Sequence, residues 1–484
     1  MFHSLVIRGP GCMVTTDMSN NSNPRVVILG AGITGLTLAR ELSEHFRGKV
    51  LVLEKEDFVG GLASTHQRDG FSFDLGSHRL HRDSPERILR YIEQVIGEDL
   101  LLSQRRGKVY YRGGFVSYPP RLTSLLRDFS LREILEVSLS YVRSFMNGQN
   151  REGSDYESAM RVAVGQKLYE TFYKDFAKKL WGMDPRYLSI DSMRKRRTPL
   201  FRQSLKRSFS GNGDRFLYPR NGIGAISKKL EQRILDSGGE MIKGVRLKNV
   251  SIHDNRISKI SFGRGQTDEE MTTEVLILIS TIPIDDLFTL VFSGEKYDPN
   301  LEWRGLRLLC LVIDHALKDD CETYYFPSTE VTLGRVSEIK KYSLHLNPTL
   351  KGTLLTIEIP ASWGDDIMTM NEAELLDRCL HDLAGVKIVE TYPKVLSYCT
   401  MALEKVYPIY RLGWKARFFE AYERLSQIEN LFTIGRGGLF LHCNIDHCIL
   451  QGLDLSDFIL RGEWCHKDLW HKKVLEFLEF SARD

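Results

Sequence analysis

The sequence lacks several features that would assign a function directly. Its 484 residues include eight cysteines but no Cys-x-x-Cys pair, so the spacing indicates neither a zinc site nor a disulfide framework. The formal net charge of +3 is too small to indicate a protein that binds polyanions along its length. These absences predict a reduced chain without a metal site and do not favour nucleic acid as a partner.

Long apolar runs and targeting signals are also missing. The longest strongly apolar stretch, Val275 to Ile284, is about half the length that spans a bilayer. Arg8, Gly9 and Pro10 interrupt the apolar run that a signal peptide needs, and the N-terminus has no Arg-rich, Ser-rich transit pattern. We therefore expect a cytoplasmic protein without stable membrane insertion. Nothing in the sequence indicates an oligomeric state.

A glycine-rich turn between a buried strand and a helix is the most specific feature near the N-terminus. The apolar run at 26–29 is typical of a strand buried on both faces, and Gly30-Ala31-Gly32-Ile33-Thr34-Gly35 follows it. In this motif Gly30 permits the tight turn, Gly32 lets the backbone approach a pyrophosphate, and Gly35 allows close helix packing. A second strand ends at Glu54, which is placed to accept hydrogen bonds from an adenosine ribose. The pattern predicts a βαβ unit that binds a dinucleotide, and it leaves FAD and NAD both open.

The rest of the chain divides into regions of different periodicity. Helical periods dominate the middle, including 131–145 and 159–179, whereas 307–313 and 352–360 alternate as antiparallel strands do. A last strand at 431–434 leads into a helix from about Asp446. The predicted fold class is therefore α/β, with a Rossmann-type dinucleotide-binding domain, a helical insertion and an antiparallel-sheet substrate domain. The expected ranges are 1–23 for a disordered leader, 24–85, 211–290 and 411–484 for the dinucleotide-binding domain, 86–210 for the mostly helical insertion, and 291–410 for the substrate domain.

The segment after Glu54 favours FAD through a resemblance. Gly60-Gly61-Leu62-Ala63-Ser64-Thr65 and the stretch from Gly70 to His78 resemble the FAD-binding region shared by flavin amine oxidases, protoporphyrinogen oxidases, phytoene desaturases and UDP-galactopyranose mutases. The resemblance implies a Rossmann-type FAD-binding domain. The residues expected to bind the cofactor are Gly30, Gly32, Ile33, Thr34, Gly35, Glu54, Lys55, Gly61, Leu62, Ala63, His78, Gly435, Arg436, Asn444 and Asp446.

Patches over most of the chain, from Arg25 to about Leu460, resemble UDP-galactopyranose mutases, particularly the eukaryotic type. Gly76-Ser77-His78 is similar to a Gly-Gly-His motif whose histidine lies against the flavin in that family. The stretch from Gly435 to His447 resembles the mutase sequence Gly-Arg, an aromatic region and Asn-x-Asp-His. Those mutases use reduced FAD to isomerise a UDP-sugar without net oxidation. The resemblance therefore implies a nucleotide-sugar substrate and reduction of the flavin by NAD(P)H.

Further matched positions imply a site for the substrate diphosphate. Tyr325 and Arg335 have the spacing of two mutase residues that hold this group, and a planar guanidinium pairs bidentately with such oxygens. Tyr407 matches a diphosphate-contacting tyrosine, and Arg196 or Arg197 falls near the family's other active-site arginine. His442 stands where eukaryotic mutases place a second tyrosine, in a segment that is shorter here. The resemblance implies catalytic roles for His78, Arg335 and Arg196, and substrate contacts for Tyr325, Arg335, Tyr407 and His442.

Two other functions stay open on the sequence alone. An oxidoreductase of the protoporphyrinogen oxidase, desaturase or amine oxidase type would pass hydride from a hydrophobic substrate to FAD and would need an apolar tunnel. Apolar residues of the helical middle could line one, namely Leu122, Leu125, Leu126, Leu131, Leu135 and Val137. A non-enzymatic escort protein of the same fold would bind no FAD, and the intact glycine turn with Glu54 argues against it.

Overall fold

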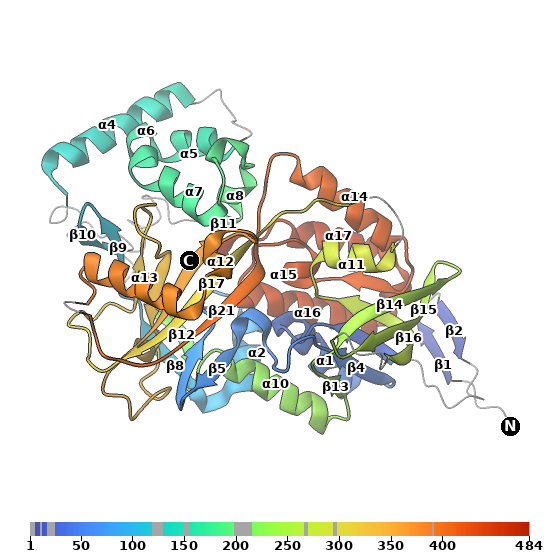
Figure 1. Cartoon of the computed structure of the whole chain (residues 1–484). Coiled ribbons are helices and arrows are strands. Elements are labelled where there is room, and N and C mark those ends of the chain that lie inside the picture. Colours follow the sequence, from blue (N-terminus) through green and yellow to red (C-terminus); the bar gives the residue numbers. More distant parts are fainter. Residues whose placement is uncertain are drawn as a thin grey trace.

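The computed structural model describes residues 5–9, 12–16, 25–118, 129–148, 155–197, 215–265, 270–293, 298–389 and 392–483. Figure 1 shows a sheet with helices around it near the N-terminus, a second sheet beside it, and a lobe of helices above the second sheet. Within the described ranges, no helix is long and apolar enough to cross a membrane.

The first sheet has the parallel core that the βαβ pattern predicts. Its strand order is β13-β4-β3-β16-β15-β14, and β22 also pairs with β16. The central strand β3 (Arg25–Leu29) runs parallel to β4 (Lys49–Leu53) on one side and to β16 (Glu270–Ser280) on the other. Its apolar side chains are buried because helices cover the sheet. The remaining strands are β13 (Glu240–Ile242), β14 (Arg246–His253), β15 (Arg256–Gly263) and β22 (Leu431–Thr433).

Helix α1 (Ile33–His45), which follows β3, packs between α10 (Ala225–Asp236) and α16 (Ile445–Leu460). At Gly452 in α16 an added Cβ would lie 2.9 Å from the Thr34 carbonyl oxygen. Only glycine therefore allows the two helices to approach so closely. The consequence is that the N-terminal turns of α1 and α16, which are more than 400 residues apart in the sequence, lie in one region.

Two strands at one edge of this sheet form a hairpin. β14 and β15 pair antiparallel across a turn at Asp254 and Asn255. These residues have φ of 46° and 59°, a conformation that Asp and Asn adopt more readily than most residues.

The second sheet confirms the predicted antiparallel character over most of its width. Its order is β10-β9-β18-β19-β20-β17-β21, and of these pairs only β18 with β9 is parallel among the described residues. Two of its strands come from the region predicted to be mostly helical, because the sequence around Gly113-Gly114 forms a hairpin whose edge joins the sheet. The strands are β9 (Gly107–Tyr111), β10 (Gly114–Tyr118), β17 (Trp303–Ile313), β18 (Thr323–Tyr325), β19 (Arg335–Glu338), β20 (Thr353–Ala361) and β21 (Val395–Pro408).

The helical lobe has a small core of its own, formed by side chains such as Tyr156, Tyr169 and Trp181, and it packs on the second sheet through Tyr407 and Ile409. Its helices are α4 (Leu131–Gly148), α5 (Tyr156–Val164), α6 (Gln166–Leu168), α7 (Lys174–Trp181) and α8 (Asp191–Arg194). This confirms the helical periods seen in the middle of the sequence.

Hydrogen bonds hold the end of helix α7 to the second sheet, with one donor on the helix and another on the sheet. The Lys179 ammonium donates hydrogen bonds to four carbonyl oxygens of the segment 326–333, at 2.5 to 3.1 Å. In return the Arg304 guanidinium of β17 donates to the carbonyl oxygens of Lys179 and Leu180, each at 3.1 Å, and to that of Pro360 at 3.0 Å. The end of α7 is therefore tied to β17, to β20 and to the segment between β18 and β19.

The remaining elements connect these parts. The strands are β5 (Thr65–Arg68), β6 (Phe71–Asp74), β7 (Leu80–His81), β8 (Leu100–Gln104), β11 (Arg196–Arg197), β12 (Arg215–Pro219) and β23 (Ala482–Arg483). The helices are α2 (Glu86–Ile96), α11 (Ile284–Val291), α12 (Asp366–Thr369), α13 (Glu372–Gly385), α14 (Trp414–Ser426), α15 (Gly435–Gly438) and α17 (Lys467–Phe477).

Two expectations about the chain ends and cysteines need correction. Within the expected disordered leader, β1 (Leu5–Gly9) and β2 (Cys12–Thr16) form an antiparallel hairpin. The sequence supports it, because β-branched residues stand on both sides of Gly9-Pro10-Gly11. Cys465 is disulfide-bonded, so the expectation of a fully reduced chain is wrong at this residue. Disulfide pairing depends on proximity in space, which the spacing of cysteines along a chain does not reveal.

Candidate functional site

The glycine motif forms a tight turn between β3 and α1. Gly30 has φ of 98°, and its N–H donates to the Leu53 carbonyl at the end of β4, at 2.8 Å. An added Cβ at Gly35 would lie 2.1 Å from the Gly30 carbonyl oxygen. Both positions therefore need glycine for the turn itself, before any ligand is considered.

Gly32 differs from Gly30 and Gly35, because a Cβ added at Gly32 would have no neighbouring atom within 4 Å. Gly32 is the N-cap of α1, and no side chain caps the helix there. Gly60 lies alongside, its N–H bonded to the Ala31 carbonyl at 2.8 Å, and the 3-10 helix Gly61–Ala63 continues from it. The helix N-terminus thus faces open space bordered by backbone, which suits an anionic group such as a pyrophosphate.

Glu54 is held at the same edge of the sheet. Its carboxylate accepts hydrogen bonds from the Ala31 N–H at 2.6 Å and from the Glu56 N–H at 2.9 Å. The neighbouring Lys55 side chain is 58% exposed, and its ammonium lies 3.5 Å from the Glu56 carboxylate. The structure thus places Glu54 beside the glycine turn, while the predicted contact of Lys55 with a cofactor stays a prediction.

The predicted cofactor-binding residues near the C-terminus lie on the side of α1 where α16 packs. Gly435 has φ of 84°, and its N–H donates to the Gln451 side chain of α16 at 2.8 Å. Asn444 is the N-cap of α16. The Asp446 carboxylate accepts hydrogen bonds from the Ser84 hydroxyl and from the His447 N–H, each at 2.9 Å. The Ser84 bond holds the first turn of α16 to the segment before α2, and Gly435 lies beside Thr34 of α1.

Several buried polar atoms around this cradle have no hydrogen-bond partner among the described residues. They are His78 Nδ1, one terminal nitrogen of Arg436 and the amide nitrogen of Gln451. Buried polar groups of this kind are normally satisfied by a ligand or by water. Together with the open space at Gly32, these atoms are compatible with the dinucleotide that the sequence predicts here.

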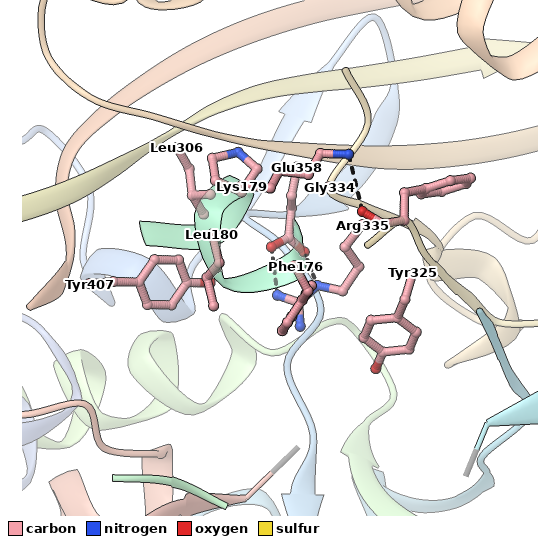
Figure 2. Close-up of a pocket in the computed structure, with 11 residues that line it drawn as sticks. Phe176, Lys179, Leu180, Leu306, Tyr325, Gly334, Arg335, Glu358 and Tyr407 are labelled. Carbon is pink, nitrogen blue, oxygen red and sulfur yellow. Dashed lines mark hydrogen bonds and ion pairs between the residues drawn. The ribbon is translucent and has the colours of Figure 1, made fainter. Parts of the chain in front are cut away.

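A second group of predicted residues meets at the end of the second sheet (Figure 2). Tyr325 on β18 and Arg335 on β19 are cross-strand partners, and both line a small pocket with Tyr407 of β21. Phe176, Lys179 and Leu180 of α7 complete its wall. The Tyr325 hydroxyl is buried and has no hydrogen-bond partner among the described residues, so the pocket offers it to a ligand.

Arg335 is paired within the protein, which the sequence did not reveal. Its Nε and Nη2 atoms donate to the two carboxylate oxygens of Glu358 on β20, at 2.8 and 2.5 Å. The same carboxylate accepts a hydrogen bond from the Ser77 N–H at 3.0 Å. Glu358 therefore joins the predicted diphosphate arginine to the loop that carries His78. A signal existed, because Glu358 is a lone acid within the apolar strand Thr353–Ala361.

His78 lies within the electrostatic reach of two arginines. Burial, together with the charges of Arg335 and Arg436, lowers the pKa of His78 to about 4, although Glu358 and the Gly76 carbonyl oppose the shift. The imidazole is therefore neutral near pH 7. An exposed imidazole titrates near neutrality, and the low-dielectric surroundings with two neighbouring cations explain the difference.

Arg436 connects the two groups of residues. It donates from Nε to the Val406 carbonyl at 2.9 Å, and its guanidinium stacks 5.1 Å from the centre of the Tyr407 ring. The Tyr407 ring lies 5.2 Å from the His442 ring. The predicted substrate residues Tyr407 and His442 thus border Arg436, which was predicted to contact the cofactor.

The structure neither tests the predicted role of Arg196 nor supports the apolar tunnel of the oxidoreductase alternative. Arg196 lies on β11, whose backbone pairs with β23 near the C-terminus, and its side chain is outside the described part, so its catalytic role stays a prediction. The apolar tunnel of the oxidoreductase alternative is not supported, because Leu131 and Leu135 are 78% and 60% exposed. Leu122, Leu125 and Leu126 lie outside the described residues. In the described part of the chain, no three His, Cys, Asp or Glu side chains cluster as metal ligands would.

An uncapped helix N-terminus after a glycine-rich turn on a parallel sheet, with a pocket on a second sheet, is typical of the dinucleotide-binding class of enzymes. Residues 33–454 match the model of the family described as flavin containing amine oxidoreductase, so the chain belongs to that family. This makes the protein a flavoenzyme that uses FAD, and the predicted fold class is confirmed.

Individual relatives are more distant. The chain is 25% identical over 177 residues to a probable UDP-galactopyranose mutase of Klebsiella pneumoniae, covering 36% of this chain and 45% of that protein. It is 35% identical over 127 residues to probable polyamine oxidase 4 of Arabidopsis thaliana, covering 24% and 25%. The matched regions thus span less than half of these relatives. The structure of a reduced UDP-galactopyranose mutase superposes with a TM-score of 0.76, 22% identity and coverage of 90% and 95%, which shows a shared fold.

Proposed function

We propose that the protein is an isomerase of the UDP-galactopyranose mutase type, acting on a nucleotide sugar through reduced flavin. One observation carries this proposal. Arg335 and the buried hydroxyl of Tyr325 line one pocket, Arg436 stacks on Tyr407 of the pocket wall, and the charges of both arginines reach His78, which is predicted to lie against the flavin. A permanent cation in the pocket and a second one beside its wall suit a diphosphate leaving group better than an apolar substrate.

Each residue has a task in this proposal. Bound FAD, once reduced, would supply the nucleophile that displaces the nucleoside diphosphate from the anomeric carbon, with no net redox change because the same bond is re-formed at the end. Arg335 keeps donors beyond its bonds to Glu358, and with Tyr325 it binds the diphosphate and stabilises its charge as it leaves. His78 is neutral and presents an unbonded Nδ1, so it hydrogen-bonds to the cofactor without adding charge.

Further parts of the proposal concern partners and location. The resemblance to the mutases supports NAD(P)H as the reductant, which bleaching of the flavin absorbance by NADPH or NADH under anaerobic conditions would test. The dTDP-fucopyranose mutase of Escherichia coli, 23% identical over 174 residues, is a second relative named for a nucleotide sugar. A cytoplasmic location stays a prediction.

The test uses FAD-loaded protein, reduced with dithionite without oxygen and incubated with UDP-galactopyranose. Chromatography should detect interconversion of the sugar ring forms, and calorimetry should detect binding of UDP. The variant Arg335→Gln/Glu358→Gln replaces both charges with amides and should lose UDP binding while keeping FAD. A matched control is Arg256→Gln/Glu429→Gln, which neutralises an ion pair with a 2.7 Å contact elsewhere. If the unmodified protein neither binds UDP nor converts any UDP-sugar tested, the proposal fails and oxidation of an amine or a hydrophobic substrate becomes the better hypothesis.

A further inference from the structure

The two residues that flank His78 are both bonded to one buried hydroxyl group. The Tyr342 hydroxyl lies 2.7 Å from the Ser77 hydroxyl, and the Nη2 atom of Arg79 donates to it at 2.9 Å. Tyr342 directly follows the 3-10 helix Ile339–Lys341 and is buried. The short segment that carries His78 is therefore held on both sides by a single side chain from a distant part of the sequence.

Tyr342 is itself firmly placed. Its hydroxyl lies 2.7 Å from the Thr323 hydroxyl of β18, and its ring centre lies 5.3 Å from those of both Phe216 and Tyr218. Burial raises the pKa of Tyr342 to about 12, so the hydroxyl keeps its proton near pH 7 and can donate one hydrogen bond while accepting others. A side chain packed in this way can fix the position of the segment bonded to it.

Arg79 adds a buried ion pair to this anchor. Its Nη2 atom also donates to the Glu322 carboxylate at 3.0 Å and to the Thr323 hydroxyl at 2.8 Å. The side chains of Arg79 and Glu322 are only 6% and 2% exposed. Burying two charges costs desolvation, and apolar residues of similar volume often give equal or greater stability. The pair therefore favours a need for fixed geometry beside His78 over a role in stability alone.

The His78 imidazole depends on its neighbours for its position. Its Nδ1 atom is buried and has no hydrogen-bond partner among the described residues. Ser77, by contrast, is bonded to Tyr342 through its hydroxyl and to Glu358 through its N–H, the latter at 3.0 Å. The direction in which the imidazole points is therefore set largely by the backbone of residues 77–79.

We propose that Tyr342 is a positioning residue, which acts through Ser77 and Arg79 to hold the His78 imidazole in a fixed orientation towards the flavin. The inference rests on the predicted contact between His78 and FAD, and it does not need the nucleotide-sugar substrate of the proposed function. Loss of the Tyr342 hydroxyl would let residues 77–79 relax and would weaken the interaction of His78 with the flavin. The reduction potential and absorbance spectrum of the bound flavin would report this change.

The experiment compares the flavin of the full-length, FAD-loaded protein with that of its Tyr342→Phe variant. Phenylalanine keeps the ring that packs against Phe216 and Tyr218 and removes only the hydroxyl. At a fixed potential, the ratio of reduced to oxidised flavin should change by roughly threefold or more, an effect of the size that one hydrogen bond has. Tyr422→Phe, at a buried tyrosine of α14, is the matched control and should leave this ratio unchanged.

A second comparison tests whether Tyr342 acts through His78. His78→Gln should itself shift the flavin potential, and adding Tyr342→Phe to it should cause no further shift, because residues in one chain of contacts do not act additively. A general effect of Tyr342→Phe on the fold would instead be the same in both backgrounds. Should Tyr342→Phe fail to fold, Ser77→Ala removes the other end of the 2.7 Å contact, and its shift should likewise disappear in the His78→Gln background.

Three results would each overturn the proposal. One is an unchanged flavin potential in Tyr342→Phe or, where that variant does not fold, in Ser77→Ala. Another is a shift of equal size with and without His78, and the third is a His78→Gln variant whose flavin matches that of the unmodified protein. None of these measurements involves UDP or a UDP-sugar, so a failure of the proposed function would be seen separately.

Discussion

The two halves of the site are built in different ways. The glycine turn of the cradle depends on backbone conformation, and no side chain caps the N-terminus of α1 that follows it. The pocket on the second sheet depends on charged side chains, and its central pair, Arg335 with Glu358, is also bonded to Ser77, 281 residues from Glu358. The glycine turn is thus specified locally, whereas the pocket, like the approach of α16 to α1, is specified by residues that meet only after folding.

The largest effects are expected from valine substitutions of two glycines in the same motif, and the two variants should fail in different ways. Gly35→Val should prevent folding, because the new Cβ would lie 2.1 Å from a backbone oxygen that cannot move away. Gly32→Val should fold normally yet purify without flavin colour, because its side chain would occupy the space left for the cofactor. Circular dichroism and flavin absorbance measure the two outcomes. A yellow Gly32→Val protein would refute the cradle assignment.

The stability of the protein around the pocket should depend on the balance of charge between Arg335 and Glu358. Arg335→Ala leaves the Glu358 carboxylate buried without its partner and should cost about 3–5 kcal/mol of unfolding free energy. Arg335→Gln/Glu358→Gln should recover most of that loss, since no uncompensated charge remains. Urea unfolding of both proteins compares them. Equal destabilisation in the two variants would show that the ion pair is not what holds this end of the sheet.

Two buried groups give the folded protein opposite dependences on pH. The pKa of His78 is lowered to about 4, so its contribution to stability is complete above its unfolded value of 6.5 and is lost as pH falls. Burial raises the pKa of Asp74 to about 6, although it accepts hydrogen bonds from Thr65 and Tyr218, so its contribution is complete in acid and is lost as pH rises from about 4 through about 6.

Single substitutions should reveal each slope. Asp74→Asn should remove a loss of up to roughly 3 kcal/mol between about pH 4 and pH 7, and His78→Gln should reduce the loss on acidification. Unfolding free energies measured across this range test both. If neither variant changes the slope, other groups control the pH dependence.

The smallest effect is expected at Lys55. Its side chain is 58% exposed, and within the described ranges its ammonium pairs with the neighbouring Glu56 alone. Lys55→Ala should change the unfolding free energy by less than about 0.5 kcal/mol and the flavin affinity by less than about twofold. A large fall in affinity would restore the predicted contact between Lys55 and the cofactor.

The sequence was sufficient for the cradle because the requirements of a glycine turn are local. Gly30 and Gly35 lie where the motif places them, and Glu54 lies beside Ala31. The pocket was only half predictable, since Tyr325, Arg335 and Tyr407 came from a resemblance and do meet. The role of Glu358 could not be predicted, because nothing in a strand's periodicity says which arginine will face a buried acid. The same holds for the low pKa of His78, which depends on tertiary burial.

The reciprocal bonds between α7 and the second sheet set a limit on modular engineering. Lys179 of α7 donates hydrogen bonds to the segment 326–333, and Arg304 of β17 donates to the end of α7. In an engineered protein these three stretches of sequence would therefore have to be exchanged together. Transplanting the helical lobe from a relative would therefore need Arg304 and the segment 326–333 to travel with it. A chimera cut only at the ends of the lobe, with another residue in place of Lys179, would leave the carbonyl groups of the segment 326–333 without this donor, next to the pocket.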